Sequence, residues 1–237
     1  MKTIPALVLI FTLLHPAFTR AAETNALSEP ALAELTKPYK KILFKTVIHA
    51  TTGFRVLDLD TNNPAHVALR GKILKAAALA GERARQEGIS SVRANEAGNH
   101  LEPFVRAALR DAGLEARIPV TTAGHAQVTG YPDIEITGAT PCYLELKTYH
   151  ATTADTTQRS FYYSPSAKPK ITHDALHFLL AYELQKVTRQ GETLFVPAHW
   201  KLLTLQDLEV DLKSEFNQSN RGMYRDGKLL LDEGKLK

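Results

Sequence analysis

Hydrophobic residues recur at helical spacing in two segments of the first half of the chain. Between residues 65 and 86 they return every three or four positions, and Gly88 follows, which predicts one long helix. A second helix is predicted to open at Asn99, with Asn99 as its N-cap and Glu102 completing a capping box, and to end at Gly113. Two amphipathic helices are therefore expected before residue 113.

After residue 113 the pattern changes to a period of two, which is typical of β-strands. Four strands are predicted, at residues 116–120, 128–137, 142–149 and 160–164. The turn at residues 138–141 is short, so the second and third of these strands are expected to pair as a hairpin.

The last third of the chain mixes both patterns. Residues 171–186 form a strongly apolar run that is predicted to be a helix, and strands are predicted at residues 193–197 and 199–205. Residues 42–48 and 208–212 stay open between helix and strand. The order of helix, strands and helix predicts an α/β domain with a mixed central β-sheet flanked by helices.

The first 22 residues have the three-part pattern of a secretory signal peptide. Lys2 gives a positive start, residues 4–14 are apolar, and small residues follow at Ala21 and Ala22, although Arg20 departs from an ideal cleavage site. The apolar run is too short for a comfortable membrane span, so no integral membrane segment is expected after cleavage. The alternatives are a retained anchor and a misassigned start codon. The pattern predicts export, either to the periplasm or to the medium.

Three regions are expected from these patterns: a signal peptide at residues 1–21, an N-terminal extension at 22–64 and one domain at 65–237. Loss of the signal peptide removes two positive charges and lowers the formal net charge from +4 to +2, so the net charge alone is weak evidence for a polyanionic partner. Cys142 is the only cysteine in the sequence, which excludes an intramolecular disulfide and a Cys-rich zinc site.

Acidic and basic side chains meet on the predicted hairpin. Glu145 and Lys147 share one face of their strand, because side chains alternate, and the partner strand brings Asp133 beside Glu145. Two adjacent carboxylates repel each other unless a cation lies between them, and oxygen ligands suit Mg²⁺, with Mn²⁺ as an alternative. Such an ion polarises a phosphate and activates water, while Lys147 would hold that water or offset negative charge.

The motifs Pro132-Asp133 and Glu145-Leu146-Lys147 resemble those of the PD-(D/E)xK nuclease superfamily. The resemblance implies a restriction-endonuclease-like α/β core and Mg²⁺-dependent hydrolysis of phosphodiesters in nucleic acid, with DNA as the expected substrate. It also implies that Asp133, Glu145 and the Leu146 carbonyl bind the metal. The family adds an acidic residue on the preceding helix, for which Glu102 fits and Glu96 is the rival.

Basic residues surround the aromatic segment 161–163. Arg159, Lys168 and Lys170 are predicted to bind nucleic acid, because cations beside aromatic rings suit a phosphate backbone with stacked bases. Alternating aromatic residues are also typical of a buried strand, and this second interpretation stays open.

Besides an exported scaffold protein without catalysis, two other functions remain open from the sequence. One is a nucleic-acid-binding module of the same fold that has lost turnover. The other is a zinc hydrolase that uses His173 and His177, which would lie four residues apart on one face of the predicted helix at residues 171–186. The sequence does not distinguish endonuclease from exonuclease, and it indicates neither sequence specificity nor oligomeric state.

Overall fold

The computed structural model describes residues 27–91, 97–157, 161–224, 229 and 231–232. The chain divides into two units, of which Pro38–Lys213 contains the central sheet and the predicted site. This unit begins at Pro38 and so includes residues that the sequence assigned to an N-terminal extension. The predicted signal peptide lies outside the described residues.

The other unit is formed by the two ends of the chain, up to Lys37 and from Ser214. Its described residues contain two short helices, α1 (Glu29–Leu35) and α5 (Asn220–Tyr224). Within the described residues, no helix in either unit has both the length and the apolar composition needed to cross a bilayer.

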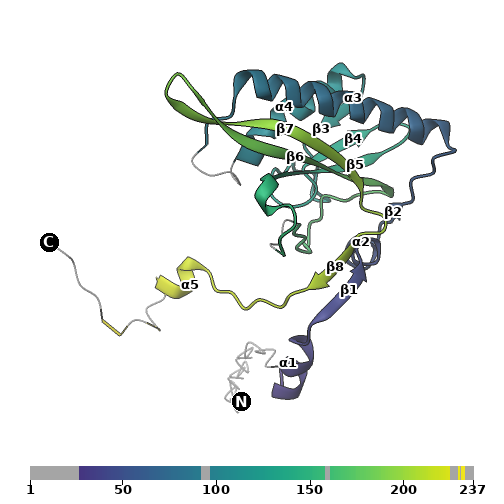
Figure 1. Cartoon of the computed structure of the whole chain (residues 1–237). Helices are drawn as coiled ribbons and strands as arrows, with labels where there is room; N and C mark the ends of the chain where they lie inside the picture. The colour runs from purple at the N-terminus through teal and green to yellow at the C-terminus, as the bar shows by residue number, and fades with distance from the viewer. Residues whose placement is uncertain (1–26, 92–96, 158–160, 225–228, 230, 233–237) are drawn as a thin grey trace, which may run out of the picture. The chain divides into compact units, whose positions relative to one another are not determined.

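A six-stranded mixed sheet forms the centre of the larger unit (Figure 1). Its strands are β2 (Val56–Leu57), β3 (Glu115–Arg117), β4 (Ile134–Thr137), β5 (Cys142–Tyr149), β6 (Ala175–Arg189) and β7 (Glu192–Thr204). The order is β2-β6-β5-β4-β3, and β7 also pairs with β6. β5 and β6 are parallel, whereas β4 runs antiparallel to both β3 and β5. The predicted hairpin and the predicted mixed sheet are therefore confirmed.

Two helices cover one face of this sheet, α3 (Pro64–Glu87) and α4 (Ala97–Asp111), as Figure 1 shows. α3 matches the predicted long helix and ends at Gly88, whose φ of +80° is accessible to glycine without strain. α4 already includes Ala97, so Asn99 lies inside the helix and the predicted capping box is wrong. Ala97 is fully buried, and this contact with the core favours the earlier helical residues.

The two segments left open by the sequence are now assigned. Residues 42–48 contain the end of β1 (Tyr39–Leu43) and the start of α2 (Phe44–Thr52). Residues 208–212 contain β8 (Glu209–Leu212), which pairs antiparallel with β1 in a separate two-stranded sheet. A short 3₁₀ helix, η1 (Ala151–Thr153), follows β5.

The predicted helix at residues 171–186 is wrong, because Ala175–Arg189 is a 15-residue strand. The first eight residues of β6 are all buried, with side chains on both faces of the sheet in the core. A strand buried on both faces is apolar at every position, so it lacks the alternation that identifies a strand in sequence. Tertiary pairing with β5 and β7 decides its conformation.

Other predicted strands differ in length. The strands predicted at 193–197 and 199–205 are one strand, β7, whose register against β6 shifts between Glu183 and Leu184. β4 is shorter than the predicted 128–137, since Pro132 has no N–H to donate to a ladder. Residues 161–164 belong to no strand.

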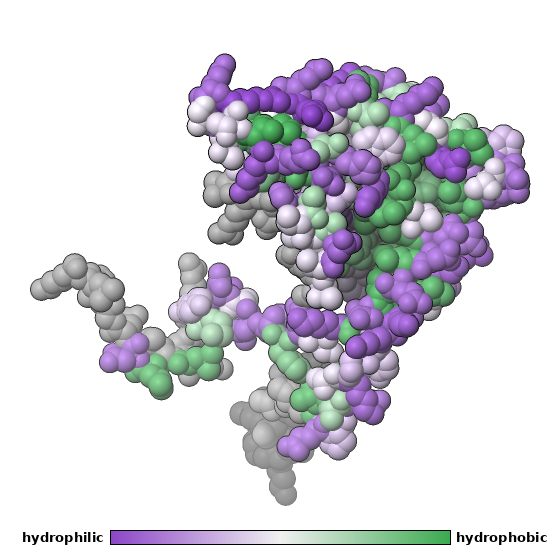
Figure 2. Space-filling model, viewed as in Figure 1, coloured by the Kyte–Doolittle hydropathy of each residue, from purple (hydrophilic) through white to green (hydrophobic). Residues whose placement is uncertain are grey.

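Hydrophobic cores lie on both faces of the sheet. On one face, α3 and α4 pack against the strands, and the outer surface of this helical layer is mainly hydrophilic in Figure 2. On the other face, α2 and several aromatic side chains pack around Tyr143 and Tyr131. Because both cores meet at β5, this strand is held rigidly along most of its length, and the predicted site lies on it.

Candidate active site

The structure brings together the two carboxylates that the hairpin was predicted to pair. Ile134 lies opposite Leu144 in the β4–β5 ladder, and extending that register by one residue places Asp133 opposite Glu145. Oδ2 of Asp133 accepts a hydrogen bond of 2.7 Å from the backbone N–H of Leu146. This bond ties the predicted Pro-Asp element directly to the strand that carries Glu145.

Glu145 is almost completely buried, with 4% of its surface exposed. Lys147 donates a hydrogen bond from Nζ to Oε1 of Glu145, as expected for two side chains on one face of β5. The second oxygen, Oε2 of Glu145, is buried and has no hydrogen-bond partner among the described residues. A buried carboxylate oxygen without a partner is costly, and it marks a position where a cation would be stabilised.

Burial and mutual repulsion control the ionisation of this pair. Burial raises the pKa of Glu145 to about 7, and the negative charge of Asp133 adds to this shift while Lys147 opposes it. Burial also raises the pKa of Asp133, and the hydrogen bond from the Leu146 N–H opposes that shift. In the protein without a bound cation, the site therefore favours keeping a proton on the carboxylate pair.

Glu102 lies on α4, close enough to Asp133 for the two carboxylates to interact electrostatically. Its side chain is 15% exposed, and Oε1 is 3.2 Å from Nε of Arg106. Burial raises the pKa of Glu102; Arg106 opposes this shift, and the charge of Asp133 adds to it. Glu102 is thus an acidic group near the carboxylate pair, whereas its rival Glu96 lies outside the described residues.

Lys170 occupies a different position from the one that its predicted role requires. The sequence placed it among surface contacts to nucleic acid, but it is 3% exposed, and Nζ donates to the backbone carbonyls of Gln127 and Gly130. Burial lowers the pKa of Lys170, while the charges of Asp133, Glu145 and Glu102 raise it. Lys170 is therefore an internal cation that partly offsets the acidic cluster.

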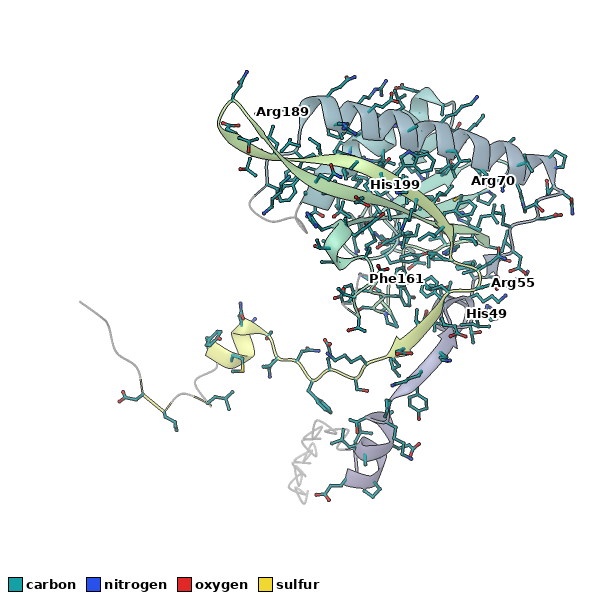
Figure 3. All side chains as sticks on the ribbon, viewed as in Figure 1. His49, Arg55, Arg70, Phe161, Arg189 and His199 are labelled. Carbon is teal, nitrogen blue, oxygen red and sulfur yellow. The ribbon has the colours of Figure 1, made fainter. Side chains whose placement is uncertain are left out.

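The remaining predicted contacts to nucleic acid are less informative. Lys168 is exposed, and Arg159 lies outside the described residues. Among the neighbouring aromatic residues, Phe161 and Tyr163 pack edge-to-face on Phe44 of α2, with ring centroids 5.0 and 5.6 Å away. Phe161 lies on the face of the sheet opposite α3 (Figure 3), so these two rings belong to the core, which is the second interpretation left open by the sequence.

The donor set fits a hard divalent cation. Asp133 and Glu145 offer carboxylate oxygens, one of them buried and unpartnered, and the repulsion between the two acids is relieved when a cation lies between them. Within the described residues, no three His, Cys, Asp or Glu side chains are grouped as metal ligands. Mg²⁺ matches this limited set, since it is usually held by one or two carboxylates and keeps several waters.

The zinc alternative loses its structural basis. His177 lies in β6, and His173 precedes that strand, so the two do not share one face of a helix. Nδ1 of His177 is 2.6 Å from the hydroxyl of Tyr131, and Nδ1 of His173 is 3.2 Å from the hydroxyl of Tyr143. Both imidazoles are thus engaged with tyrosines on the same face of the sheet as Glu145. These long-range contacts have no signature in the sequence.

Two comparisons with known proteins identify relatives of this chain. The sequence model of the type II restriction enzyme MjaV family matches residues 38–227. The type II restriction enzyme MjaV of Methanocaldococcus jannaschii is 31% identical over 214 residues, which covers 83% of this chain and 91% of the relative. Both matches include the β4–β5 hairpin and α4.

The raised pKa of Glu145 predicts a pH-dependent stability in the metal-free protein. Between pH 4.5 and about 7 the folded state holds a proton that the unfolded state has released, so stability falls as the pH rises through this range. Glu145→Gln removes this loss and should raise the free energy of unfolding at pH 8 by on the order of 2 kcal/mol. Urea titrations in EDTA at pH 5 and pH 8 measure the free energy of unfolding of both proteins.

The matched control is Glu135→Gln on the neighbouring strand. Glu135 is also buried, but Arg117 pairs with both of its oxygens at 3.0 Å. This control should lose stability at pH 8 instead of gaining it. If Glu145→Gln and the wild type show the same stability at pH 8, Glu145 is not the buried acid described above.

Proposed function

The chain belongs to the type II restriction enzyme MjaV family, and on this basis we propose that it is a metal-dependent nuclease that hydrolyses phosphodiester bonds in DNA. Type II restriction enzymes are members of the PD-(D/E)xK superfamily, so the resemblance predicted from Pro132-Asp133 and Glu145-Leu146-Lys147 is confirmed. The restriction-endonuclease-like α/β core agrees with this membership.

One observation carries the proposal: the buried Glu145 oxygen that lacks a partner beside a second carboxylate. An isolated pair of this kind costs stability unless it serves a ligand. A bound Mg²⁺, or Mn²⁺ in its place, would polarise the scissile phosphate and lower the pKa of the attacking water. The chain supplies the oxygens that would hold the ion, from Asp133, Glu145 and the Leu146 carbonyl.

The neighbouring side chains complete the proposed roles. Lys147 donates to Glu145 in the structure, and during the reaction its ammonium would hold the attacking water or offset the negative charge on the phosphate oxygens. Glu102 would assist as a nearby acid that accepts a hydrogen bond from a water at the site. Lys168 is exposed and remains the proposed contact to the DNA backbone.

Export is a separate proposal. It is supported by the positive start, the apolar run at residues 4–14 and the small residues at Ala21 and Ala22. The family match begins at residue 38, so it neither includes nor depends on this segment. An exported nuclease would act on DNA outside the cytoplasm, which differs from a role in host defence inside the cell.

Loss of either carboxylate should abolish cleavage without unfolding the protein. Asp133→Asn removes the charge but keeps an oxygen that can accept from the Leu146 N–H. Glu145→Gln likewise removes the charge but keeps an oxygen that can accept from Lys147. Each should lower the rate of Mg²⁺-dependent DNA cleavage by more than about 100-fold, since even changes to outer-shell partners cost about 10–100-fold in metal sites. Linear, circular and single-stranded DNA, and RNA, should be assayed with Mg²⁺ and with EDTA.

The control is Asp111→Asn. Asp111 is the last residue of α4, and its exposed carboxylate pairs with Arg83 of α3. This substitution should leave the rate unchanged. Cleavage by Asp133→Asn at the wild-type rate would show that the site is wrong. A wild-type protein that binds DNA and does not cut it under any of these conditions would instead be a binding module of the same fold.

Processing of the full-length chain tests export. When expressed in a bacterium with a periplasm, the chain should be recovered outside the cytoplasm with a new N-terminus near Ala21 or Ala22, as read by mass spectrometry. Leu9→Arg interrupts the apolar run and should leave an uncleaved cytoplasmic protein. Recovery of the wild type in the cytoplasm with residues 1–21 intact would contradict the proposal.

A further inference from the structure

We propose that Tyr131 and His177 form a positioning pair that holds Asp133 opposite Glu145 in the metal-binding arrangement. The inference rests on the proposed function, because it concerns the same carboxylates. It gives a role to His177, which the sequence suggested as a zinc ligand, and to Tyr131, which belongs to no predicted motif.

His177 provides a fixed point in the centre of the sheet. It lies opposite Tyr143 in the parallel β5–β6 ladder, and its carbonyl accepts a hydrogen bond of 3.0 Å from the N–H of Leu205. The residue is 1% exposed, and its ring is 5.1 Å from that of Tyr143. The ring and the backbone of His177 are therefore both held, by a neighbour on β5 and by the segment directly after β7.

Tyr131 connects this fixed point to the loop that carries Asp133. Its hydroxyl is 2.6 Å from Nδ1 of His177, and the two rings stack at 5.9 Å with an interplanar angle of 22°. Its ring also meets Phe44 edge-on, at 5.3 Å between centroids, as part of the aromatic core. Because Tyr131 is held both at its hydroxyl and along its ring, its backbone has little freedom to move. Asp133 follows only two residues later, so its position is restricted as well.

Asp133 needs such an anchor because it lies outside the β4 ladder, which begins at Ile134. Its carboxylate is tied to β5 through the Leu146 N–H, while the preceding loop is tied to β6 through Tyr131 and to Lys170 through the Gly130 carbonyl. Together these bonds hold the acid from both sides. The Tyr131 hydroxyl is the contact that a single-atom substitution removes most cleanly.

The ionisation state of His177 agrees with its role as a fixed, neutral partner of Tyr131. Burial lowers the pKa of His177 to about 3, and the charge of His173 adds to the shift, so the imidazole stays neutral at working pH. Its Nε2 is buried without a hydrogen-bond partner among the described residues. An apolar side chain would avoid that cost, so an imidazole at this position is better explained by its bond to Tyr131 than by packing alone.

The test is Tyr131→Phe, with Tyr163→Phe as the matched control. Both remove one hydroxyl from the same aromatic cluster, but the Tyr163 hydroxyl bonds to Oγ1 of Thr51, at 2.7 Å, and not to His177. Calorimetric titration with Mn²⁺ alone, without DNA, should show about tenfold weaker binding for Tyr131→Phe and unchanged binding for Tyr163→Phe. The Mg²⁺ concentration for half-maximal cleavage should rise by the same factor, while the KM for DNA stays constant.

Substitutions at His177 separate positioning from packing. In His177→Asn the amide can take the place of Nδ1 and keep a bond to Tyr131, whereas His177→Leu cannot. We expect His177→Leu to match Tyr131→Phe in Mn²⁺ binding, His177→Asn to recover most of the affinity, and the Tyr131→Phe/His177→Leu double variant to be no weaker than either single variant. Thermal melts establish that each variant is folded, and Tyr131→Phe suffices if His177→Leu does not fold.

Two outcomes would overturn the positioning role. One is wild-type Mn²⁺ affinity in Tyr131→Phe, and the other is an equal loss in Tyr163→Phe, which would indicate a general effect of the aromatic cluster. Failure of the proposed function is distinct from both, because the wild type itself would then neither bind Mn²⁺ nor cleave DNA.

Discussion

The structure depends on one electrostatic constraint: two carboxylates are held side by side, with Glu145 almost fully buried and Asp133 partly buried. Such a pair is unstable by itself, because burial and repulsion both oppose ionisation. The chain offsets part of this cost with Lys147, which bonds to Glu145, and with the buried Lys170. One Glu145 oxygen still lacks a partner among the described residues, and a divalent cation would supply the missing charge.

The sheet makes this arrangement stable enough to persist. β5 pairs with a strand on each side and packs against a hydrophobic core on each face. Glu145 therefore belongs to a rigid part of the sheet. Asp133 comes from a loop, and its position follows from its bond to the Leu146 N–H and from the contacts of Tyr131. Metal sites require ligand positions accurate to a fraction of an ångström, and a rigid strand with a tethered loop meets that requirement.

The sequence predicted those parts of the fold that depend on interactions between residues close together in the chain. The helical spacing before Gly88 and the alternation around Glu145 were sufficient to identify α3, the β4–β5 hairpin and the apposition of its two acids. β6 was mistaken for a helix because both of its faces are buried, which removes the alternation. The internal position of Lys170 and the contact between Tyr131 and His177 could not be predicted, since they join residues about 40 or more positions apart through tertiary packing.

The most direct test of the metal site is the anomalous diffraction of crystals of the protein soaked in Mn²⁺. We expect a single strong peak coordinated by oxygens of Asp133 and Glu145, with the Lys147 ammonium moved away from Glu145. A peak at His173 and His177, or no peak between the two carboxylates at a saturating Mn²⁺ concentration, would contradict this metal site.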